Sequence, residues 1–410
     1  MHLLYILLIL LLVTRIGSEI AVRLKQPALV GELLGGVLLG ILIVSAPESA
    51  EAIAELDQDK TFQAVLDLAV FFLMLLAGIE MRPGDLAQVS GKAIPIALAG
   101  MFLPLALGFG LGWWWLPDSE WKLAQSLFIG VALAITAVPV AVKVLMDFGQ
   151  LQTPVGQVVI AAAVIDDVLS LLLLAVLTAI ITADQSMSLG LLLRIVLNVA
   201  LFFAAAWLIG RHLLPRAGRY VQKLASAHAD LSLLIIFALA LSVLAEVLGM
   251  HFLIGAFAAG LLFTRNVVGQ DTHEELQSQT EAITLGFLAP VFFASIGIHL
   301  NVAALLEAPL FLLILLVAAT VGKLLGAGLA ARLAGFPGRE SLAIGSAMNA
   351  RGAVEIIIAD IALRAGLFSR PEPTPPAIDY LFSAIVIMAI LTTLSTPLAL
   401  RWLLPRKGQD

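Results

Sequence analysis

The chain has 410 residues, of which 61% are hydrophobic and only 13% are charged. Soluble domains carry about 25% charged residues, so this chain has too little polar surface for a soluble fold. It contains no cysteine, which excludes disulfides, thiol catalysis and iron–sulfur clusters, and its net charge of −6 is not arranged as a basic domain for nucleic acid. Neither a P-loop nor an HExxH pattern occurs in the sequence, and we expect neither enzyme activity nor a cofactor.

Long apolar runs recur along the whole sequence and indicate a polytopic membrane protein. A transmembrane helix needs roughly 20 predominantly apolar residues, and these runs are continuous, unlike the short alternating strands of a membrane β-barrel. We therefore predict an all-α fold with thirteen transmembrane helices, short connections and no soluble domain. The predicted spans are residues 2–14, 28–46, 61–80, 93–115, 123–146, 154–183, 189–211, 229–248, 251–265, 284–300, 308–332, 340–366 and 378–404.

The distribution of positive charge predicts the orientation of these helices. With the N-terminus outside, most of the 23 Lys and Arg residues fall in connections on the cytoplasmic side. Cytoplasmic loops of membrane proteins carry an excess of Lys and Arg. We therefore expect a multi-pass protein of the plasma membrane with an external N-terminus and a cytoplasmic C-terminus.

Two adjacent carboxylates, Asp166 and Asp167, interrupt the sixth predicted helix in the run AVIDDVLSL. A charge at the bilayer centre costs at least about 2.5–3.5 kcal/mol on insertion scales, so ionisable groups at this depth are candidates for function. Adjacent residues on a helix point in different directions, so one carboxylate can pair with a fixed cation while the other faces a water-filled cavity. The pair is therefore a candidate site at which a cation and a proton compete.

Lys323 lies near the middle of the eleventh predicted helix, in the run ATVGKLLGAG. A buried ammonium group needs a carboxylate partner, and the pair Asp166 and Asp167 can supply one. The alternative is a lysine that extends its side chain to the membrane surface, but Lys323 is about nine residues from Arg332 and lies too deep for an easy reach. We predict that Lys323 is the charge partner of the aspartate pair.

Two further helices contain residues that interrupt a helix. The fifth has Thr136 and Pro139 near its centre, where proline removes a backbone hydrogen bond. The twelfth has Asn349 and Arg351 within the run GSAMNARGAVE. Arg351 and Glu355 have the i,i+4 spacing of a helical ion pair. We predict that Pro139, Asn349, Arg351 and Glu355 support a crossing of two broken helices.

The positions of these breaks suggest an internal repeat. The first six and the last six predicted helices flank the seventh, and each broken helix is the fifth member of its set. The first set starts outside and the second inside, so the repeats would be inverted. Paired interrupted helices of this kind indicate the midplane site of a transporter, where half-helix ends present opposite dipole charges. We predict two inverted six-helix repeats with discontinuous crossing helices 5 and 12.

Several motifs resemble those of the monovalent cation:proton antiporter superfamily, in particular its bacterial NapA-like and Kef-like branch. The resemblance extends over essentially the whole chain. The aspartate pair and the run of the twelfth helix are its most specific parts. The motifs are VGELLGGVLLG, FFLMLLAGIEM, AVIDDVLSL, LGMHFLIGAFAAGLLF, APVFFASIGIHL and AMNARGAVEIIIA.

The resemblance implies roles for individual residues. Asp167 corresponds to the carboxylate that binds either the monovalent cation or the proton, and Asp166 to the carboxylate that pairs with Lys323 in electrogenic members. Thr136 corresponds to the polar residue beside the ion at the first crossing helix. The Asp-Asp pair with Lys323 resembles electrogenic sodium/proton exchangers, whereas the Met-Asn-Ala-Arg-Gly run of the twelfth helix is closer to the Kef-like proteins.

The resemblance also implies an architecture. Helices 1–3 and 8–10, at about 2–80 and 229–300, would form a dimerisation part, and the seventh helix, at about 189–211, a linker. Helices 4–6 and 11–13, at about 93–183 and 308–404, would form a mobile core that carries the ion. The family usually forms homodimers and moves this core in the manner of an elevator.

We therefore expect a secondary antiporter that exchanges Na+ or Li+ for H+, and that is electrogenic. Its partners would be the cation, the proton, the lipid bilayer and a second copy of the chain, with no nucleic acid. The alternative is a K+/H+ exchanger or a potassium efflux transporter of the Kef type. An intramembrane aspartyl protease needs two aspartates opposed from different helices, whereas Asp166 and Asp167 are adjacent on one helix.

Overall fold

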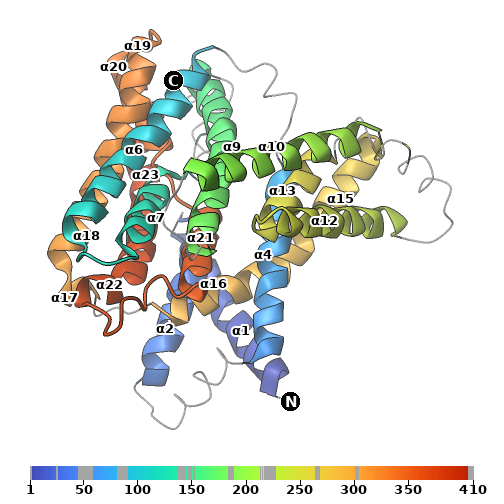
Figure 1. Ribbon diagram of the computed structural model, residues 1–410, viewed down its shortest axis with the longest axis horizontal. Helices are drawn as coiled ribbons and strands as arrows, with labels where there is room; N and C mark the ends of the chain where they lie inside the picture. Colours follow the sequence, from blue (N-terminus) through green and yellow to red (C-terminus); the bar gives the residue numbers. More distant parts are fainter. Residues whose placement is uncertain are drawn as a thin grey trace. The chain divides into compact units, whose positions relative to one another are not determined.

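The computed structural model is built of helices joined by connecting segments, and no strand occurs among the residues that it describes (Figure 1). Those residues are 2–24, 26–44, 59–80, 91–136, 145, 150, 153–182, 189–212, 214, 216, 228–263, 268–300 and 304–404. The helices are α1 (His2–Arg23), α2 (Ala28–Val44), α4 (Lys60–Glu80), α6 (Ala93–Trp115), α7 (Lys122–Ala134), α9 (Pro154–Thr182), α10 (Leu189–His212), α12 (Ala229–Val247), α13 (Phe252–Leu262), α15 (Gln270–Ile283), η2 (Thr284–Leu288), α16 (Ala289–Ile298), α17 (Ala304–Glu307), α18 (Pro309–Lys323), η3 (Leu324–Gly328), α19 (Leu329–Leu333), α20 (Gly338–Ala347), α21 (Ala353–Arg364), α22 (Pro376–Asp379) and α23 (Leu381–Leu403).

Within these described ranges, eight helices are long and apolar enough to cross a membrane. Four shorter apolar helices, in α2, α7, α10 and α13, accompany them. The prediction of an all-α polytopic membrane protein is therefore confirmed at this level. Two of the eight long helices contain a π-helical turn, η2 or η3, which the sequence analysis did not predict.

Two helices are longer than their predicted spans. The first was predicted to end at residue 14, but α1 continues to Arg23. The tenth was predicted to begin at residue 284, but the helix begins at Gln270 with the polar run QDTHEELQSQTEAI. The predictions followed hydropathy, which marks only the part of a helix that lies in lipid. These polar extensions lack interior proline, so helix formation continues beyond the apolar part.

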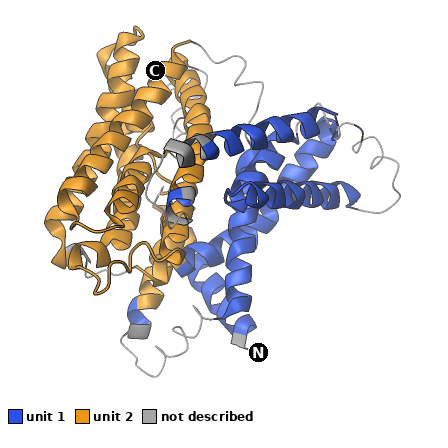
Figure 2. Cartoon of the chain, viewed as in Figure 1, with its two compact units in different colours: residues 1–15, 41–84, 178–295 blue, residues 16–40, 85–177, 296–410 orange. Residues whose placement is uncertain are grey.

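The described chain divides into two compact units (Figure 2). Unit 1 comprises Met1–Arg15, Ile41–Gly84 and Thr178–Ser295, and unit 2 comprises Ile16–Gly40, Asp85–Leu177 and Ile296–Asp410. Each unit therefore combines segments that are distant in sequence.

Unit 2 owes its close helix packing to small residues. A Cβ on Gly108 of α6 would lie 2.8 Å from the Cα of Gly130 of α7, and a Cβ on Gly326 of η3 would lie 2.3 Å from the Ala99 carbonyl oxygen. Only glycine permits such an approach between backbones. Buried alanines continue this packing between α6, α9, η3 and α20, and they are Ala97, Ala162, Ala163, Ala327 and Ala347.

Unit 1 is built in the same way around α4 and α13. A Cβ on Gly260 of α13 would lie 2.3 Å from the Leu75 carbonyl oxygen of α4. A Cβ on Gly255, one turn earlier on α13, would lie 2.3 Å from the Leu241 carbonyl oxygen of α12. Helix α13 is therefore the central element of this unit, held between α4 and α12 by its glycines.

Candidate functional site

The fifth predicted helix stops in the protein interior. Helix α7 ends at Ala134, and Ile135 is extended, with φ −70° and ψ 145°. The last carbonyl groups of a helix have no partner within the helix and carry the negative end of its dipole. The carbonyls of Ala132, Leu133 and Ala134 are in this position, and each residue is at most 1% exposed. Buried carbonyls at this depth need donors from elsewhere in the fold.

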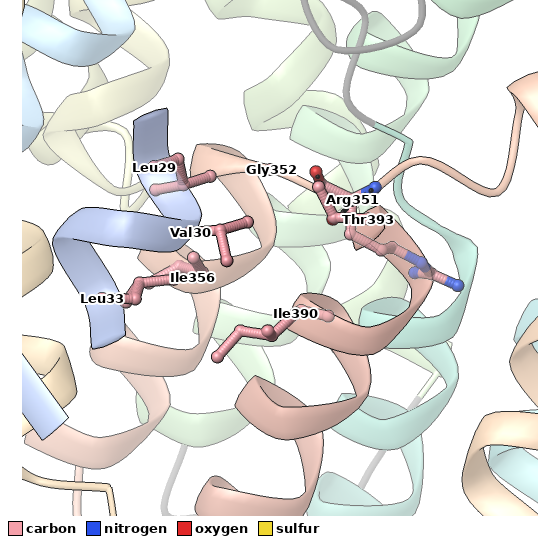
Figure 3. A pocket seen from close by; sticks show the side chains of 9 residues that line it. Leu29, Val30, Leu33, Arg351, Gly352, Ile356, Ile390 and Thr393 are labelled. Atoms are coloured by element: carbon pink, nitrogen blue, oxygen red, sulfur yellow. Dashed lines mark hydrogen bonds between the residues drawn. The ribbon is translucent and has the colours of Figure 1, made fainter. Parts of the chain in front are cut away.

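Arg351 supplies two of these donors. It is fully buried, and its guanidinium donates from Nη1 to the Ala132 carbonyl and from Nη2 to the Leu133 carbonyl, the latter at 2.7 Å. In Figure 3 the guanidinium points away from Leu29 and Val30 of α2. A cation at a helix C-terminus compensates the partial negative charge there, so Arg351 stabilises the buried end of α7.

Lys323 supplies the third donor. Its ammonium group is fully buried and donates to the Ala134 carbonyl and, at 2.7 Å, to Thr136 Oγ1. Lys323 is the last residue of α18, and the π-turn η3 begins at the next position. Single π-turns inside α-helices frequently lie at functional sites.

Thr136 links the end of α7 to the end of α20. Its hydroxyl accepts the hydrogen bond from Lys323 and donates to the Met348 carbonyl at 3.0 Å. Met348 is the residue at which α20 ends. One hydroxyl therefore links the segment after α7 to the end of α20.

The second break separates α20 from α21 at residues 348–352 and confirms an interruption in the twelfth predicted helix. Thr393 of α23 holds this segment, because its Oγ1 donates to the Arg351 carbonyl at 2.9 Å and accepts from the Arg351 amide at 3.3 Å. Beside it lies a cavity of about 10 Å³, about the size of one water molecule. Figure 3 shows its lining, to which Arg351, Gly352 and Thr393 contribute.

The carboxylate of Asp166 lies next to Lys323. Its Oδ2 is 3.5 Å from Lys323 Nζ, and both side chains are fully buried. Neither carboxylate oxygen has a hydrogen-bond partner among the described residues. A buried carboxylate needs a compensating cation, and the Lys323 ammonium supplies it here.

Glu355 is a second buried carboxylate near the crossing. It lies in the first turn of α21, where an acidic residue is favoured by the helix dipole, and it is 1% exposed. Its Oε2 is 3.6 Å from Arg351 Nη1, so the predicted i,i+4 pair is present. The crossing therefore contains two ion pairs, each of one cation and one carboxylate. They are Lys323 with Asp166 and Arg351 with Glu355.

The structure thus brings together Asp166, Thr136, Lys323, Asn349, Arg351 and Glu355 of the predicted site residues. The backbone of Asp167 lies in α9, directly after Asp166, but its side chain is outside the described part of the chain. Pro139 also lies outside the described residues.

Sequence reasoning missed the backbone carbonyls of the site and two of its threonine side chains. The carbonyls of Ala132, Leu133, Ala134 and Met348 are acceptors whose residue types give no signal. Thr320 and Thr393 were missed because threonine is common in apolar helices, where it usually bonds to its own helix. The two cations, by contrast, were visible as isolated charges in apolar runs.

Comparison with known proteins identifies the family. The profile of the family described as "Sodium/hydrogen exchanger, transmembrane" matches residues 7–406. The chain is 31% identical over 394 residues to the Na(+)/H(+)-K(+) antiporter GerN of Bacillus cereus, covering 96% of this chain and 94% of the relative. It is 29% identical over 399 residues to a Na(+)/H(+) antiporter of Enterococcus hirae, covering 97% of each protein.

A solved structure shows the same fold. The sodium proton antiporter MjNhaP1 from Methanocaldococcus jannaschii, solved at pH 8, matches with a TM-score of 0.72 and covers 100% of both chains at 17% sequence identity. The sequence matches over nearly the whole chain indicate the family, and the solved structure has the corresponding fold. This chain is a multi-pass membrane protein that belongs to the transmembrane sodium/hydrogen exchanger family.

Proposed function

We propose that this protein is a secondary antiporter that exchanges Na+ or Li+ for H+ by alternating access, with Asp167 as the group that binds cation and proton in turn. The observation that carries the proposal is that the end of α7 and the break between α20 and α21 meet beside Asp166 and Lys323. A fixed cation, Lys323, stands 3.5 Å from Asp166, which leaves the neighbouring carboxylate on α9 as the exchangeable one. The names of both relatives include Na+/H+ exchange, which favours Na+ as the cation.

The chemistry of the site requires no cofactor. Ion exchange at a carboxylate needs only that the cation and the proton compete for the same negative charge. Two internally neutral pairs, Lys323 with Asp166 and Arg351 with Glu355, leave Asp167 as the surplus charge of the crossing. Its charge is then compensated either by a cation or by a proton, which couples the two movements.

Thirteen transmembrane helices in two inverted repeats remain our proposal for the whole chain. The crossing supports it, since α7 ends at Ala134 and the α20–α21 helix is broken at residues 348–352, the fifth places of the two sets. We also propose that about 93–183 and 308–404 form the mobile core, that about 2–80 and 229–300 form a dimerisation part, and that about 189–211 is the linker. The membership of α6, α7, α18, α20 and α23 in one compact unit supports this division.

We further propose a homodimer in the plasma membrane, with the N-terminus outside and the C-terminus in the cytoplasm. The bias of Lys and Arg toward one set of connections supports this orientation. Helices α1 and α2 each expose apolar side chains that can face lipid or a second copy, and these are Leu4, Leu8 and Leu12 on α1 and Leu34, Leu38 and Ile41 on α2.

The function is tested with purified protein in liposomes that hold an inside-acid pH gradient, followed with a fluorescent dye. We expect Na+ and Li+ to collapse the gradient and choline to leave it intact. The name of one relative includes K+, so K+ is the competing cation in this test. Collapse by K+ alone would replace the proposal with a K+/H+ exchanger, and no collapse by any cation would contradict antiport itself.

Lys323→Ala is expected to remove the voltage dependence of exchange and to lower thermal stability. The substitution leaves Asp166 buried without its cation and the Ala134 carbonyl without its donor. The ammonium charge of Lys323 then no longer moves through the membrane field with the core, so the voltage dependence that this charge gives to the exchange cycle is lost. Exchange measured at clamped positive and negative potentials provides the readout.

Lys122→Ala is the matched control, because Lys122 at the start of α7 also forms an ion pair, but with the exposed Asp118 instead of a buried carboxylate. This variant should keep the voltage response of the unmodified protein. An unchanged voltage response in Lys323→Ala would contradict the role of Lys323 as the fixed charge.

A further inference from the structure

Asn349 is a predicted support residue at the crossing whose neutral side chain has a buried oxygen with no hydrogen-bond partner among the described residues. The residue lies in the break between α20 and α21 and is 4% exposed. Its Nδ2 donates to Thr320 Oγ1 at 3.5 Å, the outer limit of a hydrogen bond, and its Oδ1 has no partner among the described residues. A buried amide oxygen left in this state costs about 1–3 kcal/mol, a cost that a bound ligand would offset.

The position of this amide connects it to the ion site. Asn349 follows Met348, whose carbonyl accepts the hydrogen bond of Thr136. Thr320 lies one turn before Lys323 on α18, and Lys323 donates to Thr136 and lies beside Asp166. Asn349 therefore borders the buried polar cluster that contains the fixed charges.

The chemistry of an amide oxygen fits one ligand class. The hydrogen bonds donated by Lys323, the Arg351 Nη atoms and the Thr136 hydroxyl go to other oxygens, and Arg351 Nε donates none among the described residues, so none of them reaches Asn349 Oδ1. A dehydrated alkali cation has to replace its water shell with oxygen atoms, and the number and field strength of these oxygens set the selectivity. A neutral oxygen without a donor can serve as such a ligand at no cost to an existing hydrogen bond.

We propose that Asn349 Oδ1 is a ligand of the transported cation and sets the preference for small alkali cations. This inference rests on the proposed antiport function and adds a neutral oxygen to the site beside the exchangeable carboxylate. Li+ and Na+ bind water more strongly than K+, so they depend more on each protein oxygen that replaces a water molecule. Loss of this oxygen should therefore weaken Li+ and Na+ binding more than K+ binding.

The test compares Asn349→Leu with Thr393→Val in proteoliposomes, with the apparent KM measured for Li+, Na+ and K+. Asn349→Leu keeps the branching and the number of side-chain heavy atoms and removes only a hydrogen bond of 3.5 Å, so the protein should still fold. We expect its KM for Na+ and Li+ to rise about tenfold relative to its KM for K+, as for the loss of one hydrogen bond to a charged group.

Thr393→Val is the matched control at the same break. Thr393 makes both hydrogen bonds to the Arg351 backbone, so its loss should lower the thermal midpoint and leave the ratio of the three KM values unchanged. An unchanged KM ratio in Asn349→Leu, or a large loss of its thermal stability, would show that the amide is structural. Failure of the antiport function itself would appear separately, as absence of cation-driven proton flux in the unmodified protein.

Discussion

Asp167→Asn is expected to abolish cation-dependent proton exchange while the protein remains folded. Asparagine has nearly the same shape as aspartate, and the backbone of residue 167 lies within the continuous helix α9, so the fold is retained. The amide cannot release or take up a proton, and it offers a cation no negative charge. Both halves of the proposed cycle therefore fail together, rather than one half alone.

The measurement is proton flux in liposomes with Na+, Li+ and K+, accompanied by a thermal unfolding curve for the same preparation. Asp271→Asn is the control, because it removes one carboxylate at the exposed start of α15 and should leave exchange intact. Exchange at the unmodified rate in Asp167→Asn would contradict the assignment of Asp167. Proton flux that persists with only one cation would instead indicate a second carboxylate in the site, and Asp166 would be the first candidate.

The sequence was sufficient to predict those parts of the fold that hydropathy controls. An apolar run long enough to cross a bilayer has few alternatives to a helix, because every backbone group must be satisfied within the segment. Helix α6, for example, has the predicted bounds, 93–115. Hydropathy does not indicate how far a helix continues after it leaves the lipid. For this reason the extension of α1 and the polar helix α15 were not predicted.

The charged members of the site could be predicted because charge is rare and costly at this depth. Lys323, Arg351 and the aspartate pair stand out in apolar runs for this reason. What these residues contact could not be predicted. Arg351 could have paired with Glu355 alone, yet its main acceptors are carbonyls of α7, more than two hundred positions earlier in the chain. Backbone acceptors have no residue identity, so only the path of the chain shows where they lie.

Arg351→Met is expected to be the most destabilising single substitution at the crossing. It removes the donors to the Ala132 and Leu133 carbonyls and leaves the Glu355 carboxylate buried without a cation. Breaking a buried ion pair by removing one partner typically costs about 3–5 kcal/mol. A large fall in the thermal midpoint, together with poor yield of folded protein, is the expected result.

The double variant Arg351→Met, Glu355→Gln separates two contributions of Arg351 to stability. One is the compensation of the Glu355 charge, and the other is the hydrogen bonds to the α7 carbonyls. Neutralising Glu355 removes the uncompensated charge but not the loss of donors at the end of α7. Thermal stability should therefore recover in part, and the coupling between the two sites in a double-mutant cycle should be of the order of 0.5–3 kcal/mol. Exchange should remain impaired in the double variant, because the C-terminal carbonyls of α7 beside Thr136 still lack a compensating cation. Additive effects of the two substitutions would mean that Arg351 acts on the α7 carbonyls alone, whereas full recovery of exchange would mean that its only task is to neutralise Glu355.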